Sequence, residues 1–276
     1  MSEKPSPARD GRPVAAWKPE PPGRLKRTFL YYGIRFFVGT YVRVRHEGFD
    51  TLPDPPFVLN FSHPSWLDPF LLASHWPHHQ TLFIFGPKEE DMNAGWRNRL
   101  INWTHMAVPF RPSKTDLLDT TRRATSVLKA GYVLAVAGEG RLSDREGAIV
   151  PLEDGPAFFA LRAQVPIVPM AIVGDRWLSF GKTVTMRVGP VVPLAGRRAD
   201  REGVLSMTAE LQTAMEELLV GVEEGPLPGR FGRWMTDVLA ERPWLLESDP
   251  ESDAGGLNSV DGDDGAPPPT RRGASR

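Results

Sequence analysis

The chain has 276 residues, a formal net charge of −1 and no cysteine. This length is that of one large domain, whose core is big enough to be stable without cross-links. The absence of cysteine excludes disulfides, a thiol nucleophile and a cysteine-ligated zinc site, and the near-zero charge argues against a general nucleic-acid-binding protein.

The two ends of the chain differ in composition from the middle. Residues 1–22 are polar and rich in proline, which predicts disorder and provides no apolar segment of the kind found in secretory signals. Residues 247–276 consist largely of Gly, Asp, Pro and Ser, so they receive the same prediction. The folded domain is therefore expected over residues 23–246.

A helix is predicted over residues 24–45, where aromatic and aliphatic side chains are interspersed with basic ones. Arg24 and Arg35 project within about 20° of each other on such a helix, and apolar side chains cover the rest. This pattern favours a helix in a membrane interface, with arginines towards anionic headgroups. The alternative is an ordinary amphipathic helix packed on the domain. No stretch reaches the ~18 uninterrupted apolar residues of a membrane-spanning helix.

From residue 57 onward, short apolar runs typical of buried strands alternate with helix-like segments. Asp68-Pro69 is typical of an N-cap followed by proline at the first helical position. Ser113 and Asp116 form a capping box, and Gly131 follows as a C-cap. The alternation predicts an α/β fold with a mixed, largely parallel sheet flanked by helices. The expected strands are 57–60, 81–85, 106–110, 132–137, 166–173 and 183–188, and the expected helices are 69–74, 95–103, 114–130, 155–163 and 202–219.

A histidine and an aspartate follow the first of these strands. Pro64 biases His63 towards an extended backbone, so the histidine is expected on the loop that leaves the strand. Asp68 can fold back to the imidazole, fix its tautomer and stabilise the imidazolium, which leaves the other ring nitrogen to take a proton. The alternative is that Asp68 only caps the helix and His63 is a surface residue. With neither a cysteine nor a Gly-x-Ser-x-Gly motif, a substrate hydroxyl or a water is the expected nucleophile.

A second polar cluster, Gly138-Glu139-Gly140-Arg141, follows the strand predicted at 132–137. Strand ends in an α/β fold can converge on one site, so this turn is expected near the histidine. Arginine suits phosphate, which makes Arg141 and Arg111 candidate substrate-binding residues, although solvated loop arginines are the alternative. The histidines of HWPHH (75–79) predict no metal site, because proline breaks the helix that would align them.

Four segments in this order resemble the motifs of the glycerolipid acyltransferase family, of the 1-acylglycerol-3-phosphate acyltransferase type. The likeness covers roughly residues 25–220. The segments are SHPSWLDP (62–69), FR (110–111), GEGR (138–141) and VPIVPMAIVG (165–174).

The resemblance implies that His63 is the general base and that Asp68 orients it. It also implies that Arg111, Glu139 and Gly140 hold the acceptor, typically through its phosphate, and that Pro166 helps to shape a substrate pocket.

The third motif departs from the family pattern Phe-Pro-Glu-Gly-Thr-Arg-Ser. Arg141 stands one place early, and Glu153 occupies a position where a basic residue is common. Fewer cations near the acceptor leave amino- or sugar-linked lipids open as alternatives to a phosphate-bearing one.

Together these features predict an O-acyltransferase that moves a fatty acyl group from acyl-CoA or acyl-carrier protein to a hydroxyl of a lysophospholipid such as 1-acylglycerol-3-phosphate, in membrane phospholipid biosynthesis. The expected partners are the lipid acceptor, the acyl donor and a membrane surface, with no nucleic acid, metal or further cofactor. We expect peripheral or monotopic attachment at the cytoplasmic face of the membrane. The alternatives are a non-catalytic lipid-binding protein of the same fold and a hydrolase in which His63 activates water.

Overall fold

The computed structural model describes residues 17–88, 91–93, 95–110, 117–143 and 145–239. Most of the predicted disordered N-terminus and the whole predicted disordered tail, 247–276, lie outside these ranges. Within the predicted N-terminal segment, Trp17 is partly buried and packs against the core.

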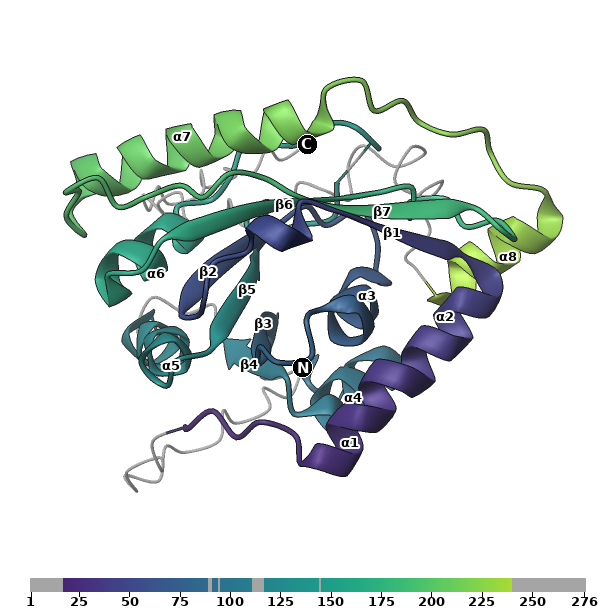
Figure 1. The fold of residues 1–276 in the computed structure, drawn as a ribbon, viewed down its shortest axis with the longest axis horizontal. Helices are drawn as coiled ribbons and strands as arrows, with labels where there is room; N and C mark the ends of the chain where they lie inside the picture. Colours follow the sequence, from purple (N-terminus) through teal and green to yellow (C-terminus); the bar gives the residue numbers. More distant parts are fainter. Residues whose placement is uncertain (1–16, 89–90, 94, 111–116, 144, 240–276) are drawn as a thin grey trace, which may run out of the picture. The chain divides into compact units, whose positions relative to one another are not determined.

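A seven-stranded mixed sheet forms the centre of the fold (Figure 1), with strand order β1-β7-β6-β2-β5-β3-β4. Six of its seven strands were expected, each within two or three residues of the observed bounds. All neighbouring strands pair in parallel except β6 and β7, so the predicted fold class is confirmed. The strands are β1 (Arg43–Glu47), β2 (Phe57–Phe61), β3 (Leu82–Lys88), β4 (Ala107–Phe110), β5 (Val133–Ala137), β6 (Ile167–Val173) and β7 (Thr183–Val188).

Helices cover both faces of this sheet, and each face has its own core. Alternate residues of β2 divide between them: Phe57, Leu59 and Phe61 pack in one core, and Val58 packs in the other. This is the period-two alternation of a strand buried on both sides. On the first face lie the N-terminal helix, α3 (Asp68–His75) and α4 (Gly95–Thr104); on the second lie α5 (Leu117–Lys129), α6 (Gly155–Ala163) and α7 (Arg201–Leu219).

The N-terminal helix is shorter than predicted. It runs through α1 (Arg24–Phe29), a π-helical turn η1 (Leu30–Ile34) and α2 (Arg35–Tyr41), and then ends. The predicted extension to residue 45 is wrong, because Arg43–Glu47 form β1 at the edge of the sheet, in parallel with β7. Alternating exposed arginines and a partly buried valine are typical of such an edge strand.

The helix ends agree with the prediction only in part. Asp68 is the first residue of α3 rather than its N-cap, which is Leu67. Gly131 has the positive φ of 81° expected of a C-cap, whereas the predicted capping box at 113–116 lies outside the described residues. A further helix, α8 (Arg230–Leu239), was not expected from the sequence.

Candidate active site

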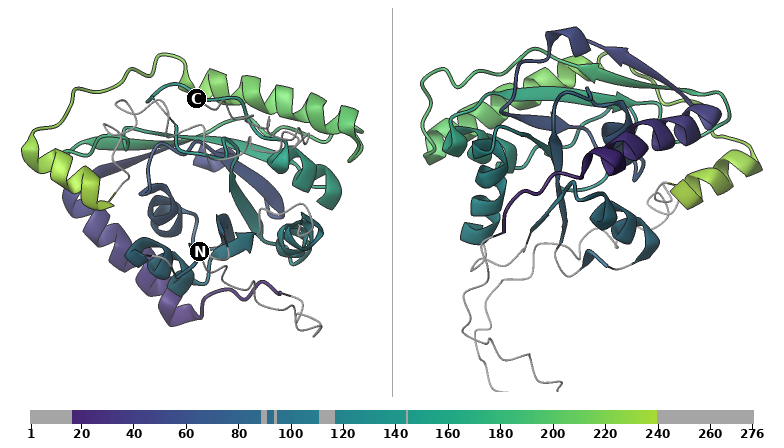
Figure 2. Two further views of the ribbon diagram at one scale, coloured as in Figure 1. Left: turned by 180° about the vertical axis from the view of Figure 1, so that it is seen from behind. Right: turned by 60° about the horizontal axis from the view of Figure 1, so that its bottom comes forward.

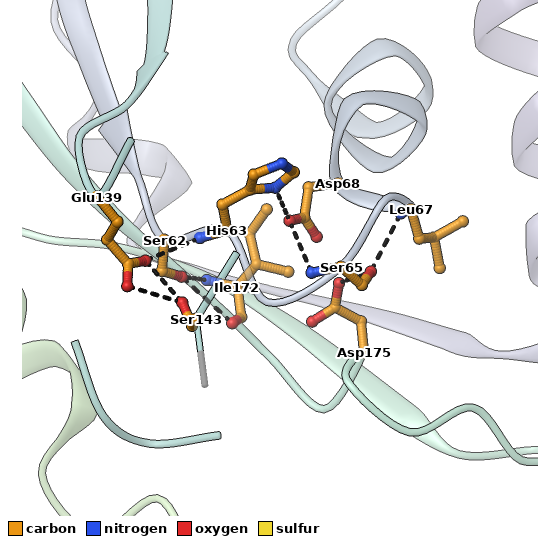
Figure 3. Close-up of polar contacts among 9 residues, drawn as sticks. All are labelled: Ser62, His63, Ser65, Leu67, Asp68, Glu139, Ser143, Ile172 and Asp175. Carbon is orange, nitrogen blue, oxygen red and sulfur yellow. Dashed lines mark hydrogen bonds and ion pairs between the residues drawn. The ribbon is translucent and has the colours of Figure 1, made fainter. Parts of the chain in front are cut away.

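Three adjacent parallel strands deliver the polar residues of the site. β2 lies between β5 and β6, and its end leads to His63. Glu139 follows the end of β5, and Asp175 follows the end of β6. The carboxyl ends of parallel strands meet at one edge of a sheet, so residues far apart in sequence come together there (Figure 3).

The hydrogen bond predicted between His63 and Asp68 is present. Asp68 Oδ2 lies 2.6 Å from His63 Nδ1, and the side chains are 0% and 19% exposed, respectively. The second ring nitrogen points away from Asp68 (Figure 3). A buried carboxylate behind a partly exposed imidazole is suited to hold one tautomer and to stabilise the imidazolium.

The turn after β5 holds the backbone of the histidine on both sides. Glu139 Oε1 accepts a hydrogen bond of 3.1 Å from the backbone N–H of His63, and the carbonyl of His63 accepts one of 2.8 Å from the N–H of Ser143. The hydroxyl of Ser143 lies 2.7 and 2.8 Å from the two carboxylate oxygens of Glu139. Glu139 is buried, so in this structure its carboxylate serves as a clamp on the histidine loop.

A second buried aspartate stands behind the dyad, and nothing in the sequence reasoning identified it. Asp175 Oδ2 accepts a hydrogen bond of 2.7 Å from the hydroxyl of Ser65, whose backbone N–H donates to Asp68 Oδ2 at 3.2 Å. Both aspartates are completely buried, and Oδ1 of each meets no N–H or alcohol O–H donor among the described residues. The only sequence signal was a carboxyl residue directly after an apolar strand.

The burial of these carboxyl groups changes their proton affinities. Burial raises the pKa of Asp68 to about 7, and hydrogen bonds from Asp175 and Ser65 oppose that rise. Burial also raises the pKa of Asp175 well above its usual range, and the neighbouring Asp68 adds to the effect. Two neighbouring buried carboxyl groups resist double ionisation.

Glycine is required at the start of the turn after β5. A Cβ on Gly138 would lie 2.1 Å from the side-chain oxygen of buried Asn60, closer than real Cβ contacts allow. Gly140 has a positive φ of 66°, in the left-handed region that favours glycine. The turn can therefore approach β2 closely enough to hold His63.

The structure does not place all of the remaining predicted substrate-binding residues at this site. Arg141 is exposed and follows the turn directly. Arg111 lies outside the described residues. Pro166 precedes β6, and its carbonyl accepts a hydrogen bond from the N–H of Val58 near the start of β2. Pro166 thus lies at the amino ends of the strands, whereas His63 lies at their carboxyl ends, so the structure does not bring Pro166 to this site.

The described part of the chain has neither a cluster of metal-ligating side chains nor a helix that could cross a bilayer. No group of three or more His, Asp or Glu side chains is placed there to hold a metal ion. His75 is buried and its Nδ1 lies 2.9 Å from the hydroxyl of Ser74, which gives it a packing role. No helix in these ranges is both long and apolar enough to cross a bilayer.

This fold and site define an acyltransferase domain. Residues 43–173 match the family model described as Acyltransferase, a range that includes β1 to β6, His63, Asp68 and Glu139. The match agrees with the four ordered motifs, so residues 43–173 form an acyltransferase domain.

A solved structure shares the fold. The crystal structure of the 1-acyl-sn-glycerophosphate (LPA) acyltransferase PlsC from Thermotoga maritima matches with a TM-score of 0.54 and 21% sequence identity. The match covers 72% of this chain and 82% of that one. At this level of identity the likeness concerns the fold.

Proposed function

We propose that the protein is an O-acyltransferase that moves a fatty acyl group from acyl-CoA or acyl-carrier protein to a hydroxyl of a lysophospholipid such as 1-acylglycerol-3-phosphate, in membrane phospholipid biosynthesis. The observation that carries the proposal is the 2.6 Å contact between His63 Nδ1 and Asp68 Oδ2, in a chain that has no cysteine. A general base without a thiol nucleophile suits direct attack by the acceptor hydroxyl. The relative of known structure is named for an acceptor of this class.

In the proposed reaction, Nε2 of His63 removes the proton from the acceptor hydroxyl as its oxygen attacks the thioester carbonyl carbon. The carbon–sulfur bond then breaks, the new ester leaves on the acceptor, and the thiolate takes the proton back from the imidazolium. Asp68 stabilises that imidazolium through Nδ1 while charge is separated. The acyl donor is the only co-substrate, and no further cofactor is used.

For the acceptor we propose a phosphate group held by Arg141 together with Arg111. Arg141 is exposed next to the turn that clamps His63, so a phosphate there would place a neighbouring hydroxyl near the imidazole. The planar guanidinium binds two phosphate oxygens at once. Arg141→Gln should raise the KM for lysophosphatidate more than that for an uncharged monoacylglycerol, and equal changes would remove the phosphate assignment.

Membrane attachment through the N-terminal helix is the second part of the proposal. Its exposed face carries Leu25, Phe29, Tyr32, Phe36 and Phe37. These residues recur at helical spacing, and basic residues such as Arg24 lie beside them, which is the pattern of an interfacial helix at the cytoplasmic face. The buried side of the same helix, including Leu30, packs on the core, so the packing alternative accounts for one side of the helix only.

The reaction is tested by incubating the purified full-length chain with a thioester donor and a panel of lysolipids, followed by mass spectrometry of the lipid products. Acyl-CoA and acyl-carrier protein are supplied in separate arms. Acylated lysophosphatidate that forms only with wild-type protein and acceptor supports the proposal. Thioester loss without acceptor would identify a hydrolase instead, and acylation of an amino- or sugar-linked lipid alone would overturn the acceptor class.

Attachment through the N-terminal helix is tested by co-sedimentation with vesicles of phosphatidylcholine and phosphatidylglycerol. Phe36→Ser/Phe37→Ser should reduce the pelleted fraction, and added salt should release part of the wild type. Substitution is preferable to truncation because residues 43–47 belong to the sheet as β1. Unchanged pelleting of the variant would return the helix to a packing role.

A further inference from the structure

Helix α8 (Arg230–Leu239) exposes large apolar side chains to solvent and buries a polar one, unlike an ordinary surface helix. Its buried side is small and polar: the hydroxyl of Thr236 accepts a hydrogen bond of 3.0 Å from the N–H of Leu178 and donates one of 2.8 Å to the carbonyl of Gly232. A Cβ on Gly232 would lie 2.6 Å from the carbonyl oxygen of Leu178, so only glycine allows the helix to sit this close. Among the α8 side chains whose burial the structure describes, Gly232 and Thr236 are the buried residues and Met235 is partly buried.

The large apolar side chains of α8 point to solvent instead. Phe231, Trp234 and Val238 are 61%, 55% and 38% exposed. Their spacing of three and then four residues places them in one stripe along the helix. In a soluble domain such a stripe normally faces the core, and a contiguous exposed one marks a binding surface.

This stripe continues onto the end of the N-terminal helix. The ring of Tyr41, the last residue of α2, lies 6.2 Å from the ring of Phe231 and 6.1 Å from that of Phe180. Phe180 is itself 79% exposed. The two helices lie side by side in the views of Figures 1 and 2, so residues from opposite ends of the domain form one apolar surface.

Basic residues accompany the stripe at the start of α8. Arg230 and Arg233 are both exposed, and Nε of Arg233 also donates to the carbonyl of Pro228 at 3.2 Å. Tryptophan and phenylalanine beside arginine suit the boundary between acyl chains and anionic headgroups, where rings insert and guanidinium groups pair with phosphate. A protein partner of matched shape would not require these flanking cations.

We propose that α8 is a second membrane-binding element, which inserts Phe231, Trp234 and Val238 into the interface of an anionic phospholipid bilayer while Arg230 and Arg233 contact its headgroups. It extends the attachment proposed for the N-terminal helix, and two linked contacts with one membrane hold a protein more firmly than either alone.

The first test is vesicle co-sedimentation of full-length variants. Phe231→Ser/Trp234→Ser should weaken partition onto phosphatidylglycerol-containing vesicles by at least about tenfold, because two large apolar side chains leave the interface. The matched control, Leu205→Ser/Val220→Ser, removes exposed apolar side chains in and directly after α7 and should bind like the wild type. Wild-type partition by the α8 variant, or equal losses in both, would overturn the proposal.

The second test uses the absence of cysteine in the chain. A single cysteine at Phe231→Cys or Leu205→Cys is labelled with an environment-sensitive fluorophore. On anionic vesicles the label at 231 should brighten and shift to the blue, and the label at 205 should not respond. A response at 231 that depends on protein concentration without vesicles would reveal a second copy as the occupant and overturn the bilayer assignment, as would no response at all.

These measurements are independent of turnover. A protein without activity towards lysophosphatidate would still show the α8 signal if the inference holds. Conversely, acyl transfer to a detergent-dispersed acceptor with no α8 signal would leave the proposed reaction intact and remove only this membrane contact.

Discussion

The hydroxyl of Ser65 donates a 2.7 Å hydrogen bond to Asp175, a residue 110 positions further along the chain. Through Ser65, whose N–H also contacts Asp68, the loop after β2 and the loop after β6 are joined directly behind the His63–Asp68 dyad. The proton affinity of the dyad therefore depends on a carboxyl group that follows a different strand.

Replacing His63 with alanine should lower acceptor-dependent acyl transfer by roughly 10²–10⁴-fold, because the general base is lost. The imidazole is partly exposed and fills no core space, so the thermal midpoint should change little. Initial rates and circular-dichroism melts measure the two effects. His79→Ala, at an exposed histidine, is the matched control and should be fully active. Near-normal turnover in a folded His63→Ala protein would dismiss the general-base mechanism.

The rate should rise with pH through the region of the Asp68 pKa. Burial raises this pKa to about 7, and only the ionised carboxylate stabilises the imidazolium, so activity is lost as pH falls below about 7. Asp68→Asn should lower the rate by roughly two orders of magnitude or more, and the acid limb should move because the amide does not ionise. Profiles of kcat against pH between 5 and 9 provide the measurement. An acid limb at an unchanged pH in Asp68→Asn would assign it to another group.

Asp175 should act on the dyad as a positioning residue that donates a hydrogen bond to ionised Asp68. Asp175→Leu removes that donor, so the ionised form of Asp68 is disfavoured and the acid limb should move to higher pH. Asp175→Asn keeps a donor of similar shape and should restore a profile near the wild type. A structural role alone would lower rates in both variants without separating their pH profiles, and that result would refute the assignment.

Gly138→Ala should destabilise the fold by roughly 1–3 kcal/mol, because the added methyl overlaps the buried side chain of Asn60. Movement of the turn should also loosen the Glu139 contact with the His63 backbone and lower activity. Urea unfolding compares it with Gly39→Ala in α2, where nothing lies within 4 Å of an added Cβ and a small gain of roughly 0.5–1 kcal/mol is expected. Equal stabilities for the two variants would contradict the overlap.

Much of the sheet could be predicted from local pattern. Continuous or alternating apolar runs between turn residues form β2, β5, β6 and β7. A strand that is buried on both faces can be recognised from such a run without knowledge of the neighbouring strands. The proximity of His63 and Asp68 was equally local, because only five positions separate these two residues in the chain.

Other features depended on partners that no local pattern reveals. β1 contains the exposed residues Arg43 and Arg45, and it forms because it pairs with β7, some 140 residues later. The Glu47–Arg187 ion pair at 2.7 Å also joins the two strands. Pro166 precedes β6 and Asp175 follows it, so the two residues lie at opposite ends of this strand and only Asp175 reaches the dyad.

The hydrophobic pattern and motifs of the chain thus determined the α/β class, the acyltransferase domain and the identity of the dyad. The tertiary structure decided which carboxyl groups surround that dyad, that Glu139 holds the histidine backbone, and that α8 turns its aromatic side outward. The reason is physical: hydrophobic periodicity reports how a residue lies within its own strand or helix, whereas burial, pKa and exposure are set by whichever distant segment packs against it.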